Sequence, residues 1–115
     1  MVDDEPMVCD TFKMLLTSVG HTVEAVTTAQ WALVVMEKGT FDLVIIDYAL
    51  PAMKGDELAV AIKERWPNQP IVIVSASAEM LQSRSQPLPG VDFILGKPFS
   101  MEELREAMAK VLPED

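Results

Sequence analysis

Short apolar runs rich in β-branched side chains alternate along the chain with longer stretches in which apolar residues recur at helical spacing. The runs at residues 41–47 and 71–75 are apolar almost throughout, which predicts strands buried on both faces. Shorter strands are predicted at residues 23–27 and 93–95. The longer strand at 41–47 ends in a bare carboxylate, Asp47, which singles out that strand end as a candidate site.

Helical periodicity predicts the first two intervening helices. The first spans residues 6–19, begins with Pro6 and is closed by Gly20. Its expected inward face holds Val8, Phe12, Leu15, Leu16 and Val19. The second helix begins after Thr28 as N-cap and ends near Gly39. It leaves Trp31 and Val34 facing outward, either as a contact patch for a partner or beneath neighbouring side chains.

The later helices have clear end signals. One is expected from about residue 55 to 66, with Leu58, Ala61 and Ile62 inward. Ser100 and Glu103 form a capping box for a final helix that buries Leu104, Ala107, Met108 and Val111. Between them, residues 79–90 hold the place of a further helix, but Pro87 and Pro89 limit it to at most two turns. Strands that alternate with helices predict an α/β domain with a parallel sheet and right-handed crossovers.

Composition limits the function classes. The 115 residues are expected to form a single domain, 1–115. A formal net charge of −9 argues against nucleic-acid binding and against an anionic membrane surface. One cysteine, Cys9, excludes an internal disulfide, and no apolar run approaches the roughly 18 residues of a membrane span. No signal-peptide pattern opens the sequence, so we expect a cytoplasmic domain.

Chemically useful side chains follow the predicted strands. Asp3 and Asp4, Asp47, Ser75 and Lys97 are all expected at one edge of the sheet, because parallel strands share their carboxyl end. Neighbouring strands lie about 4.8 Å apart, so three carboxylates there would repel each other unless a cation intervened. Mg²⁺ is the expected cation, since it takes carboxylates, waters and a phosphate oxygen. With an ammonium and a hydroxyl nearby, this set suits phosphoryl transfer.

These residues resemble the receiver domain of two-component response regulators over essentially the whole chain. The matching pieces are Asp3-Asp4-Glu5, Asp47 with Pro51 and Gly55 behind it, Ser75-Ala76, and Lys97-Pro98-Phe99. The resemblance implies a flavodoxin-like, doubly wound, five-stranded parallel sheet of order 2-1-3-4-5 with helices on both faces. Here the first strand is truncated to residues 1 and 2, and the fourth helix is shortened. We therefore hypothesise that the chain lacks a few native N-terminal residues or that another chain fills the gap.

The resemblance also implies a role for each matching residue. Asp47 corresponds to the phosphoacceptor, Ser75 to the switch hydroxyl, and Lys97 to the partner of the phosphoryl group. The metal, Mg²⁺ (or Mn²⁺), would be held by Asp4, Asp47 and the backbone carbonyl of Ala49, with Asp3 acting through water. The peptide bond between Lys97 and Pro98 is expected to be cis.

One departure from the family pattern concerns readout. The aromatic switch residue that the family often has is replaced by Ile94, and Phe93 should face the opposite side of the sheet. With the shortened fourth helix, this indicates a modified output surface.

The function that the resemblance implies is a phosphorylation-dependent signalling switch rather than an enzyme. It would accept a phosphoryl group on Asp47 from a sensor histidine kinase or a histidine phosphotransfer protein, assist its own dephosphorylation, and change its affinity for a partner. An effector domain outside this chain and a homodimer both stay open. A phosphatase of the haloacid dehalogenase type is disfavoured, because it needs a second Asp where Ala49 stands. A degenerate receiver that only binds proteins is disfavoured by the complete set of site residues.

Overall fold

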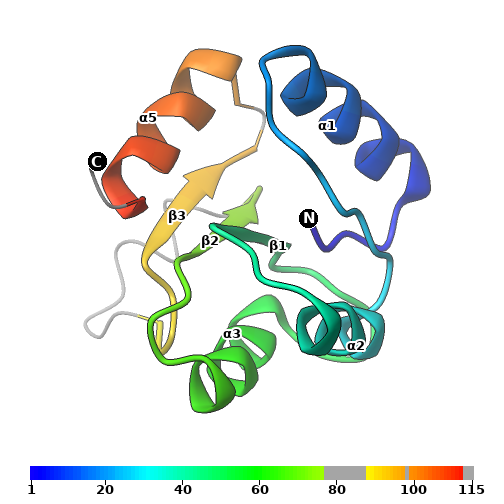
Figure 1. Ribbon diagram of the computed structural model, residues 1–115, viewed down its shortest axis with the longest axis vertical. Coiled ribbons are helices and arrows are strands. Elements are labelled where there is room, and N and C mark those ends of the chain that lie inside the picture. Colours follow the sequence, from blue (N-terminus) through cyan, green and yellow to red (C-terminus); the bar gives the residue numbers. More distant parts are fainter. Residues whose placement is uncertain (77–87, 98, 113–115) are drawn as a thin grey trace.

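The computed structural model describes residues 1–76, 88–97 and 99–112, and its centre is a parallel sheet of three strands (Figure 1). The strands are β1 (Val44–Asp47), β2 (Ile71–Ser75) and β3 (Phe93–Gly96), in the order β1-β2-β3. Every residue of β1 and β2 is buried, as their unbroken apolar runs predict. The register pairs Asp47 with Val74 and Ser75 with Gly96, so the three strands end at nearly the same level.

The first two expected strands are each reduced to a single bridging residue. Val2 forms parallel bridges to Val26 on one side and to Ile46 on the other. Its amide donates to the carbonyl of Ile45 at 2.8 Å, and its carbonyl accepts from the amide of Asp47 at 2.8 Å. The lateral sequence of segments therefore agrees with the order 2-1-3-4-5, although the described residues form three strands and two bridges rather than five strands.

A cavity of about 820 Å³ lies beside Met1, next to Leu16, Val23 and Leu43.

Helices cover both faces of the sheet, as a doubly wound fold requires. Helices α1 (Pro6–Ser18) and α5 (Met101–Val111) lie over one face, and α2 (Ala29–Lys38) and α3 (Gly55–Arg65) over the other (Figure 1). Two hydrophobic clusters correspond to these layers: Ile46, Leu58, Ile62 and Ile73 belong to one, and Phe12, Val72, Val74 and Leu104 to the other. In the described part of the chain, no helix is long and apolar enough to cross a membrane.

The predicted helix ends are confirmed. Thr28 Oγ1 accepts from the amide of Trp31 at 3.0 Å, and Ser100 and Glu103 form the reciprocal capping box. Gly20 follows α1 with φ of +98°, and the amides of Gly20 and His21 bond back to Thr17 and Leu16. This pairing is a Schellman ending, which needs the left-handed backbone that glycine adopts readily.

The predicted inward face of α1 is partly wrong. Cys9, Phe12 and Leu16 are buried, whereas Leu15 and Val19 are 44% and 41% exposed. The buried residues follow the spacing i, i+3, i+7, and the T-shaped contact of Phe12 with Phe99 points this stripe toward α5. Cys9 is therefore a core residue.

Two other expectations have different outcomes. Trp31 and Val34 do face outward from α2, at 53% and 45% exposure. The shortened fourth helix was expected within residues 79–90, most of which lie outside the described residues. Pro98, with its expected cis peptide bond, also lies outside them.

Candidate functional site

Backbone hydrogen bonds bring the ends of the central strands together at one edge of the sheet. The amide of Tyr48 donates to Val74 at 2.9 Å, and the amide of Lys97 donates to Ser75 at 2.9 Å. Asp47, Ser75 and Lys97 therefore stand at the carboxyl ends of three adjacent strands, as the sequence predicts. Asp47 and Ser75 are buried, and Lys97 is half-buried.

The bridge at Val2 delivers the acidic pair to the same edge. Oxygen atoms of Asp3, Asp4 and Asp47 all lie within 4.8 Å of one another. Asp3 is 1% exposed, whereas Asp4 is exposed to solvent. The predicted convergence of three carboxylates at this edge is therefore confirmed.

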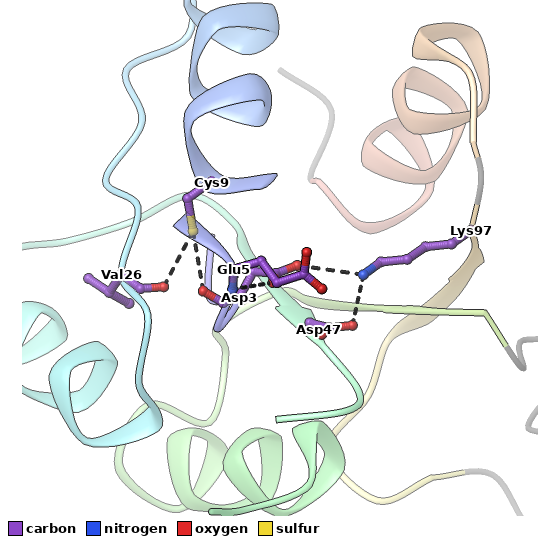
Figure 2. A network of polar contacts seen from close by, with 6 residues as sticks. All are labelled: Asp3, Glu5, Cys9, Val26, Asp47 and Lys97. Atoms are coloured by element: carbon purple, nitrogen blue, oxygen red, sulfur yellow. Dashed lines mark hydrogen bonds and ion pairs between the residues drawn. The ribbon is translucent and has the colours of Figure 1, made fainter. Parts of the chain in front are cut away.

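Lys97 reaches across the strand ends toward the carboxylates of Asp3 and Asp47 (Figure 2). Its Nζ donates to Asp47 Oδ1 at 3.0 Å and lies 3.5 Å from Asp3 Oδ2. Burial of the amine opposes its charge, but the hydrogen bond and charge of Asp47, with the charge of Asp3, outweigh it and raise the pKa of Lys97. The amine therefore stays protonated at neutral pH.

One cation does not balance this site. Among the described residues, three carboxylates face the single ammonium of Lys97, and buried Asp3 Oδ2 accepts no hydrogen bond and has only its 3.5 Å ion pair with that ammonium. A buried carboxylate oxygen that shares its one cation with a second carboxylate is costly unless a further positive charge or a donor completes it. The hard oxygen donors present here are of the kind that Mg²⁺ or Mn²⁺ accepts, so the residues fit a divalent cation.

The loop after β1 keeps close contact with the strand. Ala49, whose carbonyl is a predicted metal ligand, is exposed two residues after Asp47. The amide of Gly55 donates to the carbonyl of Tyr48 at 2.8 Å and closes the loop onto the start of α3. A Cβ atom on Gly55 would lie 2.7 Å from the carbonyl oxygen of Asp47, so only glycine fits without a shift.

The expected departure at the readout position is visible in β3. Ile94 packs against the cluster shared with α2 and α3, whereas Phe93 packs on the opposite face. Lys110 lies over the Phe93 ring, 5.0 Å from its centre. Phe93 is thus held on the α5 side, as the alternation of strand side chains predicts.

Sequence reasoning missed two groups that support the acidic pair. The amide of Glu5 donates to Asp3 Oδ1 at 2.9 Å. The thiol of Cys9 lies 3.3 Å from the carbonyl oxygen of Asp3. Burial, followed by the charge of Asp3, raises the pKa of the Cys9 thiol, so its proton is retained. The Cys9–Phe12–Leu16 spacing could have indicated the burial of Cys9, but no sequence pattern indicates its contact with Asp3.

Comparison with known proteins agrees with this arrangement. The family model for the response regulator receiver domain matches residues 1–109. The solved structure of response regulator TrrA from Thermotoga maritima, in complex with Mg²⁺-BeF, has a TM-score of 0.84 and 29% identity, covering 96% of this chain and 95% of that one. Chemotaxis protein CheY4 of Vibrio cholerae has a TM-score of 0.85 and 29% identity, covering 96% and 94%.

Curated relatives include both regulators and kinases. Transcriptional regulatory protein TcrA of Mycobacterium tuberculosis is 29% identical over 104 residues, which span 90% of this chain and 41% of TcrA. Sensor histidine kinase AruS of Pseudomonas aeruginosa is 32% identical over 115 residues, which span 96% of this chain and 12% of AruS. The chain therefore spans less than half the length of these relatives. With the flavodoxin-like fold and the family match over nearly its whole length, this chain belongs to the response regulator receiver domain family.

Proposed function

We propose that this chain is a single receiver domain, residues 1–115, that works as a phosphorylation switch with Asp47 as its phosphoacceptor. The observation that carries the proposal is the contact of Lys97 Nζ with Asp47 Oδ1 at 3.0 Å, inside a group of three carboxylates. The phosphoryl donor would be the phosphohistidine of a sensor histidine kinase or of a histidine phosphotransfer protein. Kinases and regulators among its relatives support a place in two-component signalling.

The proposed reaction is a direct displacement at phosphorus. A carboxylate oxygen of Asp47 forms a bond to the phosphorus as the phosphorus–nitrogen bond of the donor breaks, and the electron pair leaves with the imidazole nitrogen. Protonated Lys97, already bonded to Asp47, offers positive charge where the phosphoryl oxygens arrive. The hydroxyl of Ser75, buried at the end of β2, is the proposed donor to a phosphoryl oxygen.

The proposed metal ligands are Asp4, Asp47 and the backbone carbonyl of Ala49, with Asp3 acting through water. Support comes from the proximity of the three carboxylates and from buried Asp3 Oδ2, which accepts no hydrogen bond from the described residues and shares the ammonium of Lys97 with Asp47. Bound Mg²⁺ or Mn²⁺ would supply charge that neutralises the incoming phosphoryl group. The solved relative whose complex contains Mg²⁺-BeF adds to this support.

The proposed output is a change in affinity for a protein partner or for an effector region outside these residues. Phosphorylation replaces one negative charge of Asp47 with a bulkier, more negative group beside Lys97 and Ser75, and this disturbs the ends of β2 and β3. TcrA and AruS both extend well beyond the matched segment.

Acetyl phosphate with Mg²⁺ tests the proposal without a cognate kinase. Intact mass should show one phosphoryl group per chain. This group should be absent when EDTA is present during the reaction and absent in Asp47→Asn. Asp42→Asn is the matched control, since Asp42 is an exposed aspartate five positions earlier, before β1. Steady turnover of an added phosphate ester would instead indicate a phosphatase, and no phosphorylation at all would leave only a protein-binding module.

A further inference from the structure

The acidic pair is reached by an abrupt reversal of the chain. Val2 ends the bridge to the sheet, and α1 already begins at Pro6. Between them, the amide of Asp3 donates to the carbonyl of Val26 at 3.1 Å, and the Asp3 carboxylate accepts a hydrogen bond from the amide of Glu5 at 2.9 Å. These contacts hold the amide and the side chain of Asp3 but leave its carbonyl to another partner.

That partner is the thiol of Cys9, on the buried face of α1 (Figure 2). Its sulfur lies 3.3 Å from the carbonyl oxygen of Asp3 and 3.7 Å from that of Val26. A thiol has one proton, so the nearer carbonyl of Asp3 is its main acceptor. Cys9 is 4% exposed, and water therefore does not readily replace this donor.

The Asp3 carbonyl shares a rigid peptide plane with the amide of Asp4. A donor on that carbonyl therefore restrains the rotation of the plane, and with it the direction in which the Asp4 side chain leaves the backbone. Asp4 is exposed, yet its carboxylate lies within 4.8 Å of those of Asp3 and Asp47.

We infer that Cys9 is a positioning residue of the metal site: its thiol holds the Asp3–Asp4 peptide so that the Asp4 carboxylate faces Asp47. The inference rests on the proposed function, in which Asp4 is a metal ligand. Cys9 does not touch the metal or the phosphoryl group and acts through the backbone of Asp3 alone.

Two substitutions separate the hydrogen bond from the packing of Cys9. Cys9→Val keeps an apolar side chain of similar size without a donor, whereas Cys9→Ser restores a donor. The measurement is the dissociation constant for Mg²⁺, obtained by calorimetry on the unphosphorylated chain under conditions where circular dichroism shows each variant folded. We expect binding to weaken about three- to tenfold in Cys9→Val and to stay within about twofold of wild type in Cys9→Ser.

Two controls test the route of the effect. Leu16→Val trims the same buried face of α1 and should lower stability while leaving Mg²⁺ affinity unchanged. In an Asp4→Asn background, Cys9→Val should have no further effect on Mg²⁺ affinity, because the ligand that it positions is gone. The backbone amide resonance of Asp4 should shift in Cys9→Val without metal and return toward its original position in Cys9→Ser.

Several outcomes would overturn the inference. They are unchanged Mg²⁺ affinity in Cys9→Val, an equal loss in Cys9→Ser, an equal loss in Leu16→Val, or a full Cys9 effect in the Asp4→Asn background. Failure of the wild type to bind Mg²⁺ would overturn the proposed metal site as well, so the two failures are distinguishable.

Discussion

Gly55 connects the fold to the chemistry of Asp47, and its substitution by alanine offers a sharp prediction. A Cβ atom at this position would lie 2.7 Å from the Asp47 carbonyl oxygen and 2.8 Å from the Tyr48 Cα. Both atoms belong to the backbone at the end of β1, so no flexible side chain can move aside. Either the loop shifts or α3 is displaced from the sheet, and the bond from the Gly55 amide to Tyr48 lengthens.

The expected cost follows from two opposing effects. Overpacking of this kind costs about 1–3 kcal/mol. Replacing glycine also reduces the conformational freedom of the unfolded chain, which returns about 0.4–1 kcal/mol. We therefore expect Gly55→Ala to lower the free energy of unfolding by about 1–2 kcal/mol. Because the displaced backbone carries Asp47, phosphorylation by acetyl phosphate should also slow by about tenfold.

Urea denaturation and the rate of phosphoryl incorporation measure the two effects on the same variant. Gly39→Ala is the matched control, because its φ is −154° and the nearest atom to a new Cβ is a side-chain carbon of Phe41 at 4.0 Å. The control should keep the wild-type rate and be no less stable than wild type, because the unfolded-chain effect of about 0.4–1 kcal/mol then acts without overpacking. A Gly55→Ala protein that equals wild type in both measurements would refute the close packing of the loop behind Asp47.

Other predictions concern the site cation and the helix ends. The pKa of Lys97 is raised on folding from its ordinary value of 10.5. Its charge therefore stabilises the fold below pH 10.5, and that contribution is lost as pH rises through the folded-state pKa. Above pH 10.5, the free energy of unfolding measured in urea should therefore fall more steeply with pH for wild type than for Lys97→Met. Parallel curves of this free energy against pH would contradict the ion pairs. Gly20→Ala should cost about 1–2 kcal/mol, because its φ of +98° is strained for alanine although nothing blocks the Cβ; an unchanged melting temperature would argue against it. Ser100→Ala removes the capping box and should lower the free energy of unfolding by about 1 kcal/mol, measured by thermal unfolding. An unchanged stability would show that the cap does not stabilise α5.

The sequence predicts the strand ends well because the relevant patterns are local. The apolar runs at residues 41–47 and 71–75 predict buried strands, the first of which is observed only from Val44 onward, and a parallel sheet brings their carboxyl ends to one edge. The convergence of Asp3, Asp47 and Lys97 follows from that geometry, and the structure places carboxylate oxygens of Asp3 and Asp47 at 3.5 and 3.0 Å from Lys97 Nζ. Caps at Thr28 and Ser100 were likewise predictable, since each depends on residues three apart.

The parts that sequence reasoning missed depend on tertiary packing. The rotation of α1 is decided by contacts such as Phe12 with Phe99, which lie far apart in the chain. A thiol is a weak donor with no strong sequence preference, so the contact of Cys9 with Asp3 follows only from the fold. The number of residues in the first two strands depends on how many neighbours each backbone finds, and here each keeps one bridging residue.

The most direct test of this account is an anomalous diffraction map from crystals of the chain soaked in Mn²⁺. The account predicts a single peak at the sheet edge, about 2.0–2.2 Å from oxygens of Asp4 and Asp47 and from the carbonyl of Ala49, with Lys97 beside it. A peak away from Asp47, or a map without a peak there at saturating Mn²⁺, would contradict it.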